Sequence, residues 1–163
     1  MPSSSVIRDD LAALHEAVAA DSTLSFAAEG WDSWPEWYQR LLTKLWLLLA
    51  TDEVVYMSSN VSDEEGPAGS VVVFTADRVI VGEVGHTMGA ATVTTWRRRD
   101  IRSVSIEHLT PFTEGHSWPA RMRSEVIFEE GFSVILPIAA RPRQAHLRET
   151  IELLRVLARN LSA

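Results

Sequence analysis

The most concentrated source of possible chemistry in this sequence is a run of arginines near the middle of the chain. Arg97, Arg98 and Arg99 are consecutive, and Arg102 follows three residues later. A planar guanidinium group can bind a carboxylate through two parallel hydrogen bonds. On a strand, alternate side chains share a face, so we expect Arg97 and Arg99 to point one way and Arg98 the other. These four arginines are the candidate residues for binding an anion or a partner.

Three roles are open for this arginine run. Exposed charges most often stay solvated and pair with acids of the same chain. An anionic ligand or an acidic protein surface is the functional alternative. Nucleic acid is disfavoured, because no interleaved aromatic residues accompany the run beyond Trp96 and the chain carries a net charge of −7. The charge is uneven, however: residues 1–96 hold 4 basic and 14 acidic side chains, whereas residues 97–163 hold 11 and 8.

The histidines offer little prospect of a metal site. His108 and His116, with Glu107 and Glu114, come nearest to a ligand group, but an E-x-H pattern in a loop lacks a second cluster to converge on it. His86 stands near glycines and is expected to be a loop residue. We therefore expect no metal and no cofactor.

Motifs for catalysis are missing from the sequence. It contains no G-x-S-x-G, P-loop or G-x-G-x-x-G pattern, so we do not expect an enzyme. The absence of cysteine removes disulfides, thiolate nucleophiles and cysteine-ligated metals. With no signal-peptide pattern at the N-terminus, a cytoplasmic location is the expectation.

Two helices are expected before residue 52. The first should cover residues 6–20, capped by Ser4 or Ser5, because apolar residues recur there at helical spacing. Its apolar positions are Ile7, Leu11, Leu14 and Val18. The second should begin at Ser33, where Ser33 and Glu36 have capping-box spacing and Pro35 falls in the first turn, and should run to about Ala50.

The second helix has an apolar face wider than a single contact needs, so we expect it to pack against two neighbours. A core helix, a dimer interface and a membrane-surface helix are the alternatives, the last disfavoured because basic residues are few. The candidate oligomer interface consists of Trp34, Trp37, Tyr38, Leu41, Leu45 and Trp46.

From residue 52 the pattern becomes that of strands, followed by one last helix over 141–161. The clearest signal is a hairpin at residues 70–84, where two β-branched runs flank a polar turn. A mismatch at residues 103 and 104 suggests a bulge. Seven antiparallel strands are expected, over residues 53–60, the two arms of 70–84, 91–97, 101–109, and two arms either side of Gly131. The last helix should present one narrow apolar stripe, formed by Leu147, Ile151, Leu154, Ala158 and Leu161.

This order of elements resembles the pleckstrin-homology-like (PH-like) superfold, in particular the bacterial PH-like and GRAM-like domains of unknown function. The hairpin, the following strand and the last hairpin each resemble short motifs of those families. The matching residues are Phe74, Thr75, Asp77, Arg78, Val79 and Ile80, then Asp100, Ile101 and Val104, then Ile127, Phe128 and Gly131. The resemblance implies an α+β fold with a seven-stranded, partly open antiparallel barrel and a C-terminal capping helix.

The resemblance covers residues 52–163 and leaves residues 1–51 as an N-terminal helical extension of one domain. It implies a binding or assembly module rather than a catalyst. Familiar phosphoinositide recognition is disfavoured, because Asp63, Glu64 and Glu65 occupy the loop where such domains carry basic residues.

We therefore expect a noncatalytic module for protein binding or self-association, and a homo-oligomer through residues 34–49. One alternative is a small-molecule carrier or enzyme with a pocket lined by Trp34, Trp37 and Trp46 between the helices and the barrel. Another is peripheral membrane association through the arginines.

Overall fold

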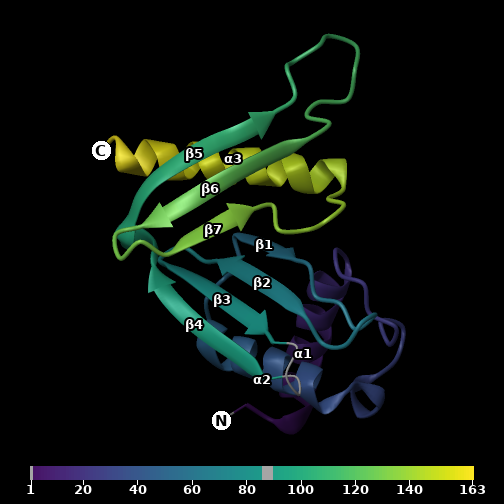
Figure 1. Ribbon diagram of the computed structural model, residues 1–163. Coiled ribbons are helices and arrows are strands. Elements are labelled where there is room, and N and C mark those ends of the chain that lie inside the picture. The colour runs from purple at the N-terminus through teal and green to yellow at the C-terminus, as the bar shows by residue number, and fades with distance from the viewer. Residues whose placement is uncertain (1, 86–89) are drawn as a thin grey trace.

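The computed structural model describes residues 2–85 and 90–163, and these residues form an α+β fold of three helices and two antiparallel sheets (Figure 1). The helices are α1 (Ser4–Ala19), α2 (Glu36–Leu49) and α3 (Gln144–Leu161). The first sheet contains β1 (Tyr56–Ser59), β2 (Gly69–Phe74), β3 (Arg78–Val84) and β4 (Ala91–Arg97). The second contains β5 (Ile101–Leu109), β6 (Met122–Phe128) and β7 (Ser133–Leu136).

The expected hairpin at residues 70–84 is confirmed as β2 and β3, which pair with Val72 opposite Val81. Its turn is closed by Thr75, whose backbone N–H donates to the Arg78 carbonyl (2.9 Å) and whose Oγ1 accepts from the Arg78 N–H (3.1 Å). The expected strand over 91–97 is confirmed as β4. The first strand is shorter than expected, since regular pairing begins only at Tyr56.

The central hairpin of the first sheet, β2 and β3, is buried on both faces, which explains why its sequence is almost continuously apolar. Alternate side chains such as Val73 and Ile80 face α1 and α2, whereas Val72 and Val81 face the second sheet and α3. A Cβ at Gly82 would lie 2.9 Å from Leu41 Cδ1, so this glycine in mid-strand lets α2 approach the sheet closely. As expected from its wide apolar face, α2 contacts two neighbours, α1 and the sheet.

Both N-terminal helices begin differently from expectation. The residue before α1 is Ser3, not Ser4 or Ser5, and it makes no side-chain capping bond. The capping box at Ser33 is wrong, because Ser33 ends a short 3-10 helix, η1 (Trp31–Ser33), and Pro35 stands just before the first turn of α2. No side-chain hydrogen bond caps the start of α2.

The second sheet carries two irregularities in β5 rather than one. The register shifts between Ile101 and Ser103, close to the expected bulge, and again between Ile106 and His108. The hairpin around Gly131 is confirmed, and this glycine has a φ of 82° in the turn. The long β5–β6 connection projects from the body of the molecule (Figure 1).

The apolar stripe expected on α3 is confirmed for three of its five residues, since Leu147 and Leu154 are buried and Ile151 packs against the same cluster. Ala158 and Leu161 are exposed, whereas Leu153 and Leu157 join Leu147 in the cluster between the two sheets. The buried face also contains two polar residues, His146 and Thr150. A prediction based only on the spacing of apolar residues does not include them.

Within the described residues the strands form two separate sheets, of four and three strands, and no closed barrel. The chain passes from one sheet to the other through a second 3-10 turn, η2 (Arg98–Asp100). None of the described helices combines the length and the apolar character needed to cross a membrane.

Candidate functional site

The arginine run borders a hollow of about 680 Å³ at the point where the chain leaves the first sheet. We call this cavity the arginine hollow. It lies between the β2–β3 turn, the end of β4 with η2, and the C-terminal end of α3. Its lining residues are Ala76, Asp77, Arg78, Arg97, Arg98, Arg99, Ile101, Leu157, Asn160 and Leu161.

The expected alternation of the arginines along a strand is wrong. Only Arg97 belongs to β4, whereas Arg98 and Arg99 lie in η2. Because the 3-10 turn ends the pleat, Arg97, Arg98 and Arg99 all line the same hollow. Arg102 is exposed on β5 and is not among the residues lining the arginine hollow.

Arg98 is the fixed member of the arginine hollow. Its Nη1 donates to the Thr75 carbonyl (2.8 Å), and its backbone N–H donates to the Asp77 carbonyl (2.8 Å). Burial lowers the pKa of this guanidinium, and the nearby Asp77 carboxylate acts in the opposite direction. A half-buried, hydrogen-bonded guanidinium loses little further freedom when it meets an anion.

The other arginines of the hollow differ in how far they are already paired. Arg78 donates from Nε and Nη2 to Asp52 Oδ2 (3.0 and 2.7 Å), so its charge is largely compensated. Arg99 lies 3.9 Å from the Asp100 carboxylate, and both side chains are exposed. Within residues 2–85 and 90–163, Arg97 makes no ion pair. Arg97 and Arg99 are therefore available to an anion from outside the chain.

The hollow also has an apolar side. Leu157 and Ile101 are buried in the cluster between the sheets, whereas Leu161 is exposed at the end of α3. A ligand that suits this arrangement carries negative charge beside a hydrophobic group.

The candidate oligomer interface lies mostly inside the chain. Trp34, Tyr38, Leu41 and Leu45 are buried among α1, α2 and the first sheet, and Trp37 and Trp46 are half-buried against the same cluster. An interface made by the four buried side chains would require α2 to leave the sheet, so they do not form an exposed contact surface. Of the three tryptophans expected to line a pocket between the helices and the strands, Trp34 and Trp37 instead pack against Tyr38. Trp46 does line a hollow of about 360 Å³ there, with Leu14 and Met57.

Two hydrogen bonds of His15, on α1, join it to Tyr38 of α2 and to the segment between these helices. His15 Nε2 lies 2.8 Å from the Ala27 carbonyl, which can only accept, so Nε2 carries the proton. In the neutral ring, Nδ1 is then the acceptor for the Tyr38 hydroxyl at 2.9 Å. His15 is a buried structural histidine.

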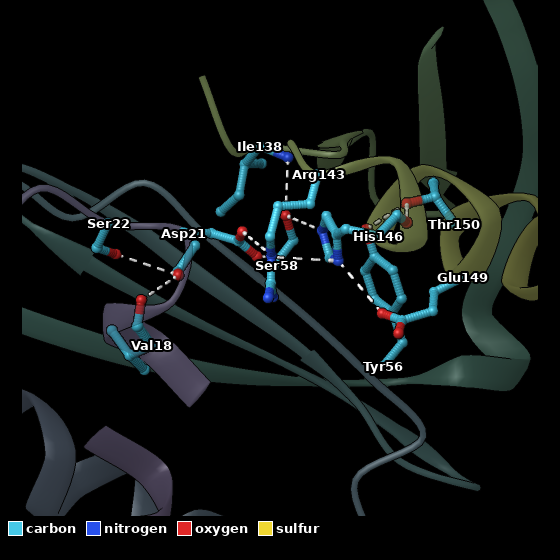
Figure 2. Close-up of polar contacts among 11 residues, drawn as sticks. Val18, Asp21, Ser22, Tyr56, Ser58, Ile138, Arg143, His146, Glu149 and Thr150 are labelled. Carbon is cyan, nitrogen blue, oxygen red and sulfur yellow. Dashed lines mark hydrogen bonds and ion pairs between the residues drawn. The ribbon is translucent and has the colours of Figure 1, made fainter. Parts of the chain in front are cut away.

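A second polar cluster, which we call the α3 polar cluster, joins α3 to β1 and was not anticipated from the sequence (Figure 2). His146 and Thr150 project from α3 toward Tyr56 and Ser58 of β1. His146 Nε2 lies 3.0 Å from Ser58 Oγ, and Nδ1 faces two carboxylates, Glu149 at 3.4 Å and Asp21 at 3.9 Å.

Hydrogen-bond directions in the α3 polar cluster follow from its carbonyl acceptor. The Thr150 hydroxyl donates to the His146 carbonyl (2.9 Å), so the Tyr56 hydroxyl must donate to Thr150 Oγ1 (2.8 Å). The Ser58 hydroxyl accepts from the Ile138 N–H (3.1 Å) and makes a second hydrogen bond with His146 Nε2, whose direction depends on which ring nitrogen carries the proton. Each hydroxyl therefore has a partner.

The serine, histidine and carboxylates of this cluster resemble a hydrolytic triad only in composition. Ser58 is 1% exposed, so a substrate carbonyl has no room beside its hydroxyl. The contacts join β1, the β7–α3 connection and α3, and their position favours a structural role.

Both tyrosines of the chain are expected to make the fold sensitive to alkali. Burial raises the pKa of Tyr56 to about 12, and burial also raises the pKa of Tyr38. Because the unfolded state releases these protons near pH 10 and the folded state holds them, stability is expected to fall as pH rises from about 10 to 12. Absorbance at 295 nm should show little tyrosinate until unfolding begins, whereas ionisation of both tyrosines near pH 10 with the fold intact would contradict this.

The remaining candidates do not form a site. No group of three or more histidine, aspartate or glutamate side chains suited to a metal occurs in the part of the chain that the structure describes. His108 and His116 are exposed, and His86 lies outside the described residues.

Comparison with known protein families and curated proteins does not assign this chain to a family. The chain matches neither a model of a known protein family nor a curated protein sequence. The arginine hollow and the α3 polar cluster must therefore be interpreted from their own chemistry.

Proposed function

We propose that this chain is a noncatalytic binding module whose arginine hollow takes up an acidic, partly apolar segment of another protein. The observation that carries the proposal is the position of Arg97 and Arg99, which border the same hollow as the fixed Arg98 and an apolar wall. Charge-assisted hydrogen bonds to carboxylates are about twice as strong as neutral ones. Burial of a neighbouring hydrophobic side chain against the apolar wall would add to the binding free energy.

The wider assignment belongs to the same proposal. A four-stranded and a three-stranded antiparallel sheet, followed by one C-terminal helix, support a PH-like fold with an N-terminal helical extension. Because a fold alone does not determine a function, the proposal of binding rests on the arginine hollow and not on this likeness. The lack of cysteine supports placing the module in the cytoplasm, and a bacterial origin follows only from the resemblance.

The direct test is binding of a fluorescein-labelled peptide of alternating glutamate and leucine, followed by fluorescence anisotropy. We expect saturable binding that weakens as salt is added, and no binding of a matched peptide with glutamine in place of glutamate. Replacing Arg97 and Arg99 by glutamine should weaken binding about tenfold for each guanidinium lost.

The matched control is Arg40→Gln, which removes one positive charge from an exposed ion pair with Glu36 on α2, away from the hollow. This variant should bind the acidic peptide as the native chain does. Equal affinity of the Arg97 and Arg99 variants and the native chain would show that the hollow is not the site.

Self-association is the second candidate, supported by the acidic first 96 residues and the arginine-rich remainder. In that case the acidic surface of one copy would occupy the arginine hollow of the next. We expect light scattering to show a concentration-dependent increase in mass that high salt reverses, and a constant monomer mass up to high micromolar concentration would reject this candidate.

A further inference from the structure

A second arginine cluster lies on the outer face of the three-stranded sheet, at the opposite end of α3 from the arginine hollow. It borders a hollow of about 880 Å³, which we call the outer-face hollow. Its charged members are Arg121 and Arg123 at the start of β6 and Arg141 in the β7–α3 connection. These arginines come from two segments of the chain that are about 20 residues apart.

The outer-face hollow has an excess of positive charge. Arg123 Nε donates to Glu107 Oε2 at 2.6 Å. Among the residues that the structure describes, Arg121 and Arg141 make no ion pair. Of the three guanidinium groups only that of Arg123 has an ion-pair partner, which makes the hollow locally basic in a chain whose net charge is −7.

The walls of this hollow are held by hydrogen bonds to the rest of the fold. The Arg121 N–H donates to Thr110 Oγ1 (2.8 Å), which fixes the base of the β5–β6 arm. The Ile138 N–H donates to Ser58 Oγ (3.1 Å), which fixes the connection that carries Arg141. In β5, the register shift before His108 places that residue opposite Arg123. Arg121 and Arg123 therefore project from hydrogen-bonded backbone at the start of β6, and Arg141 from a connection that is anchored at Ile138.

From this arrangement we infer that the outer-face hollow binds a phosphomonoester group. A phosphomonoester carries about −1.5 to −2 charges near pH 7, which suits the two guanidinium groups without an ion pair, and its oxygens can accept from several guanidinium forks at once. Its apolar lining, including Ile135 and Pro137, gives room for the group that bears the phosphate. The site is independent of the arginine hollow.

The first test is an NMR titration of the ¹⁵N-labelled full chain with sodium phosphate, with sodium chloride at equal ionic strength as reference. We expect saturable shifts of the backbone amides of residues 120–123 and 138–141. Arg141→Gln should weaken phosphate binding about tenfold, whereas Arg40→Gln should leave it unchanged. The absence of saturable shifts, or full affinity in the Arg141 variant, would overturn the inference.

A second variant is expected to increase the affinity for phosphate instead of lowering it. Glu107→Gln removes the carboxylate that competes for Arg123, so it should tighten phosphate binding about threefold or more. The control is Glu130→Gln in the β6–β7 turn, which removes the same charge away from the hollow. If both variants tighten binding equally, the effect is one of net charge and the proposed site is wrong.

The phosphate could come from a lipid headgroup or from a free phosphorylated molecule, and vesicles distinguish the two. Phe112, on the projecting β5–β6 arm, is 73% exposed and contacts Trp118 edge to face, so a lipid source should also depend on Phe112. Co-sedimentation with phosphatidylcholine vesicles that contain phosphatidic acid, reduced by Phe112→Ser, would support the site with a lipid source. Phosphate binding without co-sedimentation would support it with a free ligand, whereas equal binding to phosphatidylglycerol vesicles would overturn it.

Discussion

A Leu45→Ala variant is expected to lose about 2 to 5 kcal/mol of unfolding free energy, the usual cost of truncating a fully buried leucine. Leu45 is 0% exposed and lies in the cluster that α2 forms with α1 and the first sheet. Its Cδ2 lies 3.5 Å from the Cβ position of Gly82, so the cavity would open where α2 approaches the sheet at this glycine. Urea denaturation followed by circular dichroism measures the loss.

The matched control is Leu47→Ala on the same helix. Leu47 is 60% exposed, so its truncation should change stability by less than about 0.5 kcal/mol. The comparison distinguishes a core helix from an interface helix. If Leu45→Ala left the stability of the monomer unchanged but dissociated an oligomer, the packing of α2 described here would be wrong.

A His146→Ala variant is expected to cost about 2 to 4 kcal/mol. The imidazole is 3% exposed, and its removal takes away a hydrogen-bond partner of the Ser58 hydroxyl and opens a cavity beside Tyr56. The loss should appear in chemical denaturation at pH 7.

Glu149→Gln is the control for this variant, because Glu149 faces the same ring but its side chain is 66% exposed. Its effect should stay within about 0.5 kcal/mol. A stable His146→Ala protein would show that the α3 polar cluster does not hold α3 on β1.

The sequence predicts the strands well where apolar alternation and turn residues agree. The hairpin of β2 and β3 and the full length of β4 follow from local patterns alone. Helix starts are harder to predict from the sequence. Ser33 has the spacing of a capping box, yet it ends η1, next to the contact between the Trp31 and Trp34 rings. The burial of α2 follows from its wide apolar face, but the sequence alone does not distinguish a chain's own sheet from a second copy as the partner.

The functional residues were only partly accessible from sequence. The arginine run is visible as a pattern, yet the turn η2 that brings Arg98 and Arg99 to one hollow is not. The α3 polar cluster joins residues about 90 positions apart, such as Ser58 and His146. One signal was present: His146 and Thr150 are four residues apart, which places two polar side chains on one side of the last helix.

The most direct test of the proposed binding function is an NMR titration of the ¹⁵N-labelled full chain with the glutamate–leucine peptide. The proposal expects the largest shifts around the arginine hollow, in residues 76–79, 97–101 and 157–161, with residues 120–123 and 138–141 little changed. Shifts centred on any other surface, or no shifts at all, would contradict the assignment of the arginine hollow as the binding site.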